Sequence, residues 1–310
     1  MNLIEYIRHA FVGTSRARDE HHRARATQPT IEDGLATFAT LEGNRLVAPE
    51  DKPIFLLSAG WRSGSTLLQR LIMSSPQVLL WGEPYDECGV IQALAQTMRC
   101  FRPGWPPSDY FLEQHAGKPL AGEWIANLFP EPQAWRAAHL AFFERAFAEP
   151  ARHAGATRWG IKEVRLDVQH AHYLRWIYPD AKFVFLYRDP LQAYRSYCRY
   201  GRNWYDTWPD RPVFTPTAFG RHWRNLTQGY LRGANKLGAL VLRYEDVVQG
   251  SEALLSAIDR HLEISVDRSV LSQKIGSSER GGEQAWVSRL EKSLLRRAVS
   301  PVAQELGYRW

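Results

Sequence analysis

The most informative segment of the 310-residue chain is Ser58-Ala-Gly-Trp-Arg-Ser-Gly-Ser-Thr66. It follows the apolar run Ile54-Phe-Leu-Leu57 and precedes apolar residues at helical spacing, namely Leu67, Leu68, Leu71 and Ile72. This pattern predicts a strand, a tight Gly/Ser turn and a helix. Backbone N–H groups converge at such a turn, and the helix N-terminus adds a partial positive charge. The segment is therefore predicted to bind an anion such as a phosphate.

The loop differs from the phosphate-binding loop of kinases and nucleotide hydrolases. It lacks the Gly-Lys-Ser/Thr ending of that loop, and its cation is Arg62, which stands before the second glycine. A P-loop kinase or hydrolase, the alternative class, binds ATP with Mg²⁺, and the sequence has no convincing metal-binding aspartate for that role. A phosphate-like group is expected here, but not the γ-phosphate of ATP.

Short apolar runs alternate with helical patterns along the rest of the chain. Strands are predicted at 78–81, 159–161, 182–187 and 239–242, with helices between them. This alternation indicates an α/β fold with a P-loop-like, largely parallel central sheet flanked by helices. Polar motifs follow the predicted strands, and ligands of such sheets bind at the carboxyl ends of the strands. We therefore expect one shared site.

The chain divides into two parts on composition. Residues 1–50 are interpreted as a polar N-terminal arm, and residues 51–310 as the main domain. A mostly helical insertion at about 85–157 interrupts the α/β alternation, and a helix is predicted within it from Ala134 to Ala148.

Charge and composition argue against several classes of protein. The formal net charge is +6, but the 39 Lys and Arg residues are spread along the chain and form no nucleic-acid-binding motif. No apolar run approaches the roughly 20 residues of a membrane span, and no secretion signal is visible. The three cysteines, Cys88, Cys100 and Cys198, lack metal-ligand spacing, which favours reduced thiols in a cytoplasmic protein. The oligomeric state is left open.

A second anion-binding candidate is Tyr187-Arg-Asp-Pro-Leu-Gln-Ala-Tyr-Arg-Ser196. Arg188 stands at a strand end and Ser196 eight positions later, so two helical turns bring both side chains to one side. Arginine offers a planar fork to phosphate, and serine offers a hydroxyl donor. Taken alone, Arg-Asp-Pro also fits a simple helix start, with Asp189 as the cap and Pro190 in the first turn.

Together, the two motifs resemble those of the sulfotransferases that use 3′-phosphoadenosine 5′-phosphosulfate (PAPS). The resemblance implies that Arg188 and Ser196 bind the 3′-phosphate. Tyr244, in the run Arg-Tyr-Glu-Asp at 243–246, matches a further family segment and is an additional cofactor-binding candidate. The similarity spans residues 52–310 apart from the insertion. The residues implied in binding the 5′-phosphosulfate are Arg62, Ser63, Gly64, Ser65 and Thr66.

The match is nearer to the tyrosylprotein and carbohydrate branch than to the cytosolic phenol and steroid branch, where a lysine occupies the position of Arg62. Tyrosylprotein enzymes carry a lysine 26 residues before the 3′-phosphate arginine, as Lys162 stands here. They also carry a catalytic glutamate at the end of the second strand, where Glu83 stands. The sequence departs from their pattern by one extra residue between Pro76 and Gly82, and by Pro84.

These matches imply transfer of a sulfuryl group from PAPS to an acceptor hydroxyl. Arg62 and Lys162 would stabilise charge developing on the leaving oxygen, and Glu83 would take the acceptor proton. Ser278, with Ser277 as a rival, is the nearest match to a late-loop serine that assists the leaving group in the family. No metal is required, because cationic side chains neutralise the phosphosulfate. Alternatively, Glu83 is a strand-end carboxylate that pairs with a basic side chain, and Lys162 simply pairs with Glu163 or Asp167.

The sequence leaves the acceptor open. The Glu83 and Lys162 pattern favours a peptidyl tyrosine, and a glycan or small-molecule hydroxyl is the alternative. The insertion and the loop at 201–215 are expected to shape the acceptor pocket, where Arg99 and Arg102 would read an acidic group or simply face solvent. A non-catalytic PAPS-binding protein, in which Glu83 is dispensable, is a further possibility.

Four polar or aromatic residues have structural interpretations as well. Tyr244 is also compatible with core packing, and Asp246 is interpreted as a helix cap. His170 and His172 lie two positions apart and do not share a helical face, which favours packing roles over a metal site.

Overall fold

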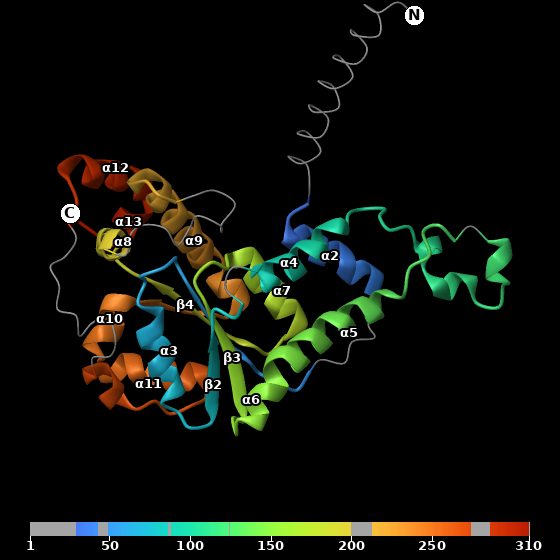
Figure 1. Cartoon of the computed structure of the whole chain (residues 1–310), viewed down its shortest axis with the longest axis horizontal. Helices are drawn as coiled ribbons and strands as arrows, with labels where there is room; N and C mark the ends of the chain where they lie inside the picture. Colours follow the sequence, from blue (N-terminus) through green and yellow to red (C-terminus); the bar gives the residue numbers. More distant parts are fainter. Residues whose placement is uncertain are drawn as a thin grey trace, which may run out of the picture.

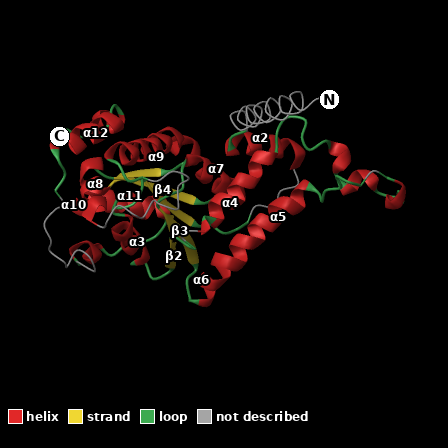
Figure 2. Ribbon diagram, turned by 45° about the horizontal axis from the view of Figure 1, so that its top comes forward, coloured by secondary structure: helices red, strands yellow, loops and turns green. Residues whose placement is uncertain are grey.

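The computed structural model describes residues 29–42, 49–85, 88–123, 125–199, 213–273 and 286–309. At its centre is a five-stranded parallel sheet in the order β2-β3-β1-β4-β5 (Figure 1). The strands are β1 (Ile54–Ser58), β2 (Val78–Gly82), β3 (Arg158–Glu163), β4 (Lys182–Tyr187) and β5 (Leu240–Arg243). Helices flank this sheet on both faces, as Figure 2 shows. The predicted α/β class is confirmed.

The α-helices of the described residues are α2 (Ile31–Glu42), α3 (Ser65–Met73), α4 (Val90–Gln96), α5 (Pro132–Phe143), α6 (Glu149–His153), α7 (Val168–Ile177), α8 (Pro190–Arg199), α9 (Pro216–Leu237), α10 (Tyr244–Gln249), α11 (Glu252–Leu262), α12 (Arg289–Val299) and α13 (Val302–Glu305). None of them combines the length and apolarity that crossing a membrane requires.

The central strand β1 divides the core into two clusters because its side chains alternate between the two faces. Ile54 and Leu56 pack with apolar residues of α3, α10 and α11. Phe55 and Leu57 face the larger cluster, which includes residues of α2, α5, α7, α9 and α12. Both faces of the sheet are therefore covered, which accounts for the continuous apolar runs in its strands.

The insertion between β2 and β3 is mostly helical. It contains α4, α5, α6 and several short 3₁₀ turns, and the part between α4 and α5 extends away from the sheet (Figure 1). The helix predicted from Ala134 to Ala148 is interrupted, because its last turn, Glu144–Ala148, is a π-helix. Pro150 follows in the first turn of α6, where it has no N–H to continue the α-helical ladder.

Part of the stretch interpreted as an N-terminal arm packs on the main domain. Helix α2 buries Phe38 completely, and the Phe38 ring makes edge contacts with Phe101 and Trp176 at centroid distances of 4.8 and 5.3 Å. Helix α2 thus closes the larger core cluster beside α7.

Candidate active site

The candidate residues lie at one edge of the sheet. The strand register pairs Leu57 with Glu163, Gly82 with Lys162, and Tyr187 with Arg243, so the parallel strands end at nearly the same level. The loops that leave these strands therefore emerge side by side, where open α/β sheets bind ligands.

The loop between β1 and α3 has the backbone of an anion-binding turn. Arg62 and Gly64 both have positive φ, at 66° and 88°, and Gly64 is the N-cap of α3. A Cβ atom at Gly64 would lie 2.0 Å from Cδ2 of Tyr244. Glycine is therefore required here both by the backbone and by the close approach of the Tyr244 ring.

The serine and threonine residues of this loop differ in how far their side chains are exposed. Ser63 is buried, and its hydroxyl lies 2.9 Å from the hydroxyl of Ser58. Ser65 is buried in the first turn of α3, whereas Thr66 is exposed. For Ser63 and Ser65, the backbone N–H is therefore the group best suited to meet an anion.

Three chain segments converge at Arg62. Its Nε donates to the hydroxyl of Ser196 on α8 at 2.7 Å, and its carbonyl oxygen accepts from Nη1 of Arg188 at 3.0 Å. The Arg188 guanidinium lies 4.4 Å above the ring of Tyr244. The structure thus brings together Arg62, the segment of Arg188 and Ser196, and Tyr244, three parts of the chain that are far apart in the sequence.

Arg188 has a buried donor that the described residues leave unused. Its Nε is buried and has no hydrogen-bond partner among them. Because buried donors are almost always paired, this nitrogen fits a position where an anionic ligand oxygen completes the hydrogen bonding.

The alternative interpretation of Arg-Asp-Pro is also correct at the level of local structure. Oδ1 of Asp189 accepts from the backbone N–H groups of Leu191 and Gln192 at 2.7 and 3.2 Å, so Asp189 caps α8. In addition, Nε1 of Trp223 donates to the carbonyl oxygen of Arg188 at 3.0 Å. These contacts fix the backbone from which the Arg188 side chain projects, so capping and ligand binding are compatible.

Glu83 and Lys162 form an ion pair at the ends of the adjacent strands β2 and β3. Nζ of Lys162 contacts Oε1 of Glu83, and the Lys162 side chain is only 6% exposed against 20% for Glu83. The backbone N–H of Glu83 donates to the carbonyl of Lys162 at 2.8 Å. Glu83 and Tyr85 have positive φ values of 45° and 56°. For non-glycine residues this conformation costs about 1–3 kcal/mol and is typical of functional sites.

Two further charged residues border this ion pair: Glu163, which the sequence offered only as an ion-pair partner of Lys162, and Arg165, which we did not single out. Nη1 of Arg165 lies 3.8 Å from Oε2 of Glu83. Glu163 is buried, and burial, with a further contribution from the charge of Glu83, raises its pKa to about 8. The run Lys162-Glu-Val-Arg165 was the available signal, but it says nothing about which strand lies next to β3.

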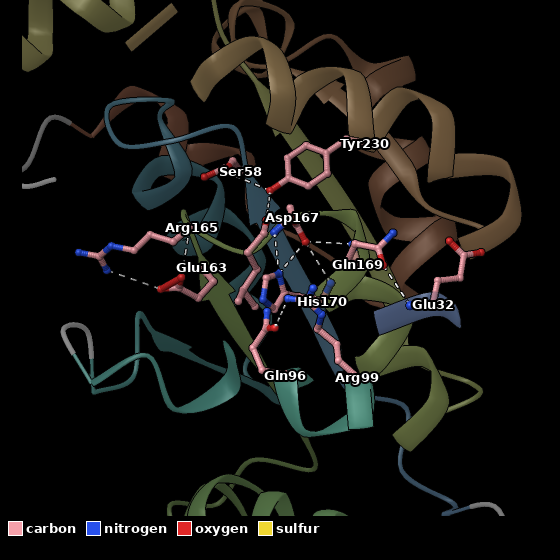
Figure 3. Close-up of polar contacts among 11 residues, drawn as sticks. Glu32, Ser58, Gln96, Arg99, Glu163, Arg165, Asp167, Gln169, His170 and Tyr230 are labelled. Carbon is pink, nitrogen blue, oxygen red and sulfur yellow. Dashed lines mark hydrogen bonds and ion pairs between the residues drawn. The ribbon is translucent and has the colours of Figure 1, made fainter. Parts of the chain in front are cut away.

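Polar contacts behind the site hold the ends of β1 and β3 in place (Figure 3). The hydroxyl of Tyr230 on α9 donates to the carbonyl of Leu166, and it lies 3.3 Å from the carbonyl oxygen of Ser58. Asp167 caps α7 in a reciprocal capping box with His170. His170 therefore has a structural role, as the sequence interpretation predicted.

Other predicted residues are placed away from the site or are not described. Asp246 is not the cap of α10, because the helix begins at Tyr244 and its N-cap is Arg243. Asp246 lies within the first turn, three residues after the N-cap, so that interpretation was wrong. Ser277, Ser278 and residues 201–212 lie outside the described residues. Within the described ranges, no group of three or more His, Cys, Asp or Glu residues is arranged to hold a metal ion.

Comparison with solved structures gives sulfotransferases at low sequence identity. The sulfotransferase domain of the Synechococcus PCC 7002 olefin synthase has 16% identity and a TM-score of 0.45, over 86% of this chain and 100% of that chain. Sulfotransferase STF9 from Mycobacterium avium has 15% identity and a TM-score of 0.42, over 89% and 82%. Mouse sulfotransferase SULT7A1, solved with PAP, has 12% identity and a TM-score of 0.31, over 90% and 71%.

A match to a family model identifies the family of the chain. No curated protein matches the chain. A family model described as "Sulfotransferase family" matches residues 53–268, which include all five strands and most of the flanking helices. The chain belongs to the sulfotransferase family.

Proposed function

We propose that the protein transfers the sulfuryl group of PAPS to an acceptor hydroxyl. The observation that carries this proposal is the convergence of Arg62, Arg188 and Ser196 beside the loop that precedes α3. Membership of the sulfotransferase family supports the same donor. A nucleotide with two separated anionic groups suits two arginines, Arg62 and Arg188, that lie on two loops in contact with each other.

The residues of the candidate site suit both anionic groups of PAPS. The backbone N–H groups of residues 63–66, with Arg62, would hold the 5′-phosphosulfate at the N-terminus of α3. Arg188, through its unused Nε, and Ser196 would hold the 3′-phosphate. Tyr244, stacked under the Arg188 guanidinium, would keep that side chain oriented.

When bound, PAPS supplies the sulfuryl group, whose bond to the 5′-phosphate oxygen breaks as the acceptor oxygen attacks the sulfur. Glu83 would accept the proton of the attacking hydroxyl, an effect typically worth about 10²–10⁴ in rate. Arg62 and Lys162 would stabilise the negative charge that remains on the 5′-phosphate oxygen. Ser278, with Ser277 as the rival, stays the proposed late-loop residue, and no step requires a metal.

The order of the strands supports the proposal that the insertion at 85–157 lies on the acceptor side. Glu83 and Lys162 come from β2 and β3, and the insertion connects these two strands. Arg188, Ser196 and Tyr244 come from β4, β5 and the helices that follow them, beyond β1. The insertion is therefore attached beside the proposed base rather than beside the proposed 3′-phosphate residues.

For the acceptor, we propose only a chemical class. A peptidyl tyrosine is preferred on the Glu83 and Lys162 pattern, and a glycan or small-molecule hydroxyl is the alternative. Nε of Arg99 donates to the carbonyl of Pro29 at 2.7 Å, so Arg99 is held within the fold. Arg102 is exposed and remains the candidate of the two for contact with an acidic acceptor. A cytoplasmic location is part of the same proposal.

Thermal shift with adenosine 3′,5′-bisphosphate, compared with ATP plus Mg²⁺, tests the donor. The bisphosphate is expected to stabilise the protein, by about 2.7 kcal/mol at 100 times its Kd, and Arg188→Ala is expected to abolish most of this shift. Arg268→Ala is the control, because Arg268 pairs with Glu252 on the surface and, among the described residues, has no hydrogen bond or ion pair with a site residue. Stabilisation by ATP–Mg²⁺ alone would overturn the proposal.

Transfer of label from sulfur-labelled PAPS to a panel of tyrosine peptides, glycans and phenols tests the reaction. The expected result is labelling of one acceptor class by the native protein and a loss of at least about 100-fold with Glu83→Gln. Full activity of Glu83→Gln on the labelled acceptor would remove Glu83 as the base. Binding of the donor without transfer of label to any acceptor in the panel would favour a non-catalytic PAPS-binding protein.

A further inference from the structure

Arg165 lies behind the proposed base as a buried cation between two carboxyl groups. Its side chain is 2% exposed, and Nη1 lies 3.8 Å from Oε2 of Glu83 and 4.0 Å from Oε1 of Glu163. Its backbone N–H donates to Oε2 of Glu163 at 3.2 Å. Figure 3 shows the Arg165 side chain extending beside Glu163 and away from the capping residues of α7.

Trp61 completes the surroundings of the same carboxylate oxygen. The Arg165 guanidinium lies 4.1 Å from the centroid of the Trp61 ring, and Nε1 of Trp61 donates to Oε2 of Glu83 at 3.1 Å. Oε1 of Glu83 faces Lys162 instead. Each oxygen of Glu83 therefore has its own partners: Oε2 accepts a hydrogen bond from Trp61 and lies at ion-pair distance from Arg165, and Oε1 contacts Lys162.

We propose that Arg165 and Trp61 are positioning residues for Glu83: together they hold Oε2, so that Oε1 is presented beside Lys162 to the attacking hydroxyl. This inference rests on the proposed role of Glu83 as the base. Arg165 is inferred to act through Glu83, because its Nη1 lies 3.8 Å from Oε2 of Glu83 and its guanidinium lies against Trp61, which donates to the same oxygen.

The charges around Arg165 support its action on Glu83 rather than on Glu163. Burial raises the pKa of Glu163 to about 8, so this group is mainly protonated at neutral pH. His222, on α9, is within reach of the Arg165 charge, and burial lowers its pKa to about 4, so it is neutral. Glu83 contacts both cations, Lys162 through Oε1 and Arg165 through Oε2.

A purely structural role for Arg165 makes a different prediction. Removing a buried arginine from its carboxylate partners destabilises a protein wherever it lies, so a loss of stability says nothing about positioning. Arg136 is a matched control: it is buried, its Nε lies 4.0 Å from Oε1 of Glu42, and its guanidinium lies 5.7 Å from the centroid of the Trp176 ring. Within the described part of the chain, none of its hydrogen bonds or ion pairs involves a site residue.

A double-mutant cycle with Glu83→Gln separates the two roles. Arg165→Met is expected to lower kcat for label transfer from PAPS to the acceptor found in the panel by about 10–100-fold, as loss of a supporting partner typically does. Its effect in the Glu83→Gln background is expected to be no more than about 2-fold. The Kd for adenosine 3′,5′-bisphosphate is expected to stay within about 2-fold of native. Arg136→Met is expected to lower stability but to leave kcat unchanged.

Trp61→Phe provides a second route if Arg165→Met does not fold. The substituted ring still lies under Arg165 but has no N–H for Glu83, so a smaller loss of kcat is expected, again absent in the Glu83→Gln background. A readout independent of activity is the indole ¹H–¹⁵N signal of Trp61, identified by its absence in Trp61→Phe. It is expected to move in Glu83→Gln and in Arg165→Met, but not in Arg136→Met.

The outcomes distinguish the two proposals. If Glu83→Gln keeps full activity, the proposed base fails and this inference fails with it. If Glu83→Gln is inactive but Arg165→Met and Trp61→Phe keep native kcat, only the positioning inference is overturned. Equal fold-losses from Arg165→Met in the native and Glu83→Gln backgrounds also overturn it, because the effect then does not pass through Glu83.

Discussion

Glu163 places an ionisable carboxyl group inside the fold, and this has a consequence for stability. Its pKa is raised from 4.5 to about 8, first by burial and second by the charge of Glu83. Between these two values the native protein keeps a proton that the unfolded chain has released. The free energy of unfolding therefore falls as pH rises through this window, by at most about 1.4 kcal/mol per pH unit for one proton. Above about pH 8 the contribution is constant, because both states are ionised.

Glu163→Gln, which resembles the protonated acid in shape, is expected to remove this decline. The stability of the variant relative to native should rise steadily between pH 5 and pH 8, measured by urea unfolding at fixed ionic strength. Glu252→Gln serves as the control, because the Glu252 side chain is 79% exposed. A constant stability difference between the Glu163 variant and native protein over this range would mean that Glu163 titrates normally.

Among individual residues of the candidate site, Glu83 and Lys162 could be predicted from the sequence and Arg165 could not, for a physical reason. Glu83 and Lys162 were identified by their match to residues of the tyrosylprotein enzymes, but their contact was not, because it requires β2 and β3 to be neighbours. Strand order is a property of the whole sheet. Arg165 was missed for the same reason, since nothing in its own segment shows that Glu83 and Trp61 lie beside it.

At the scale of elements, the loop before α3 and the start of α10 form one unit. Gly64 has φ of 88°, and the Tyr244 ring occupies the space that a side chain at Gly64 would need. The same ring lies under Arg188. A change at Gly64 is therefore expected to reach Arg188 through Tyr244, although Gly64 and Arg188 are on different elements.

Gly64→Ala is expected to weaken binding of adenosine 3′,5′-bisphosphate by at least about 10-fold, measured by calorimetry, since the donor geometry of Arg188 is displaced. It should also cost about 1 kcal/mol or more in stability through backbone strain. Gly117→Ala separates these effects, because Gly117 has φ of 79° with no atom within 4 Å of the added Cβ. Gly117→Ala is expected to lose stability through strain but to bind adenosine 3′,5′-bisphosphate as tightly as native protein. Equal affinities of both variants and native protein for this ligand would contradict the proposed connection between Gly64 and Arg188.

Element boundaries were predicted well where apolar runs define them. The strands at 182–187 and 78–81 correspond to Lys182–Tyr187 and Val78–Gly82, because buried parallel strands are apolar on both faces. The helix from Ala134 was predicted without its π-helical turn at Glu144–Ala148, since periodicity alone does not show how the ladder adjusts before Pro150. The cap of α10 was misplaced at Asp246 because no capping side chain marks its start.

For the whole molecule, the order β2-β3-β1-β4-β5 separates two groups of site residues on either side of β1. The proposed base, Lys162 and Arg165 come from β2, β3 and the loops after them, whereas Trp61 comes from the loop after β1. Arg188, Ser196 and Tyr244 come from β4, β5 and the helices after them, and the loop after β1 lies between the two groups. This division was not predictable from the sequence, in which the motifs simply follow one another. It implies that donor and acceptor approach β1 from opposite halves of the sheet.

Hydrogen exchange measured by mass spectrometry tests this division. With adenosine 3′,5′-bisphosphate at 100 times its Kd, we expect slower exchange at short times in residues 58–66, 187–199 and 243–247, where local opening exposes the proposed donor contacts. Amides that must release the ligand to open should slow by about 100-fold. The insertion, residues 88–123 and 125–157, should exchange as in the free protein at these times, because it is attached beyond β2 and β3. Arg188→Ala protein with the same ligand is the control and should show little protection. Protection centred on the insertion would place the nucleotide on the side that we assign to the acceptor, and would reverse the proposed arrangement.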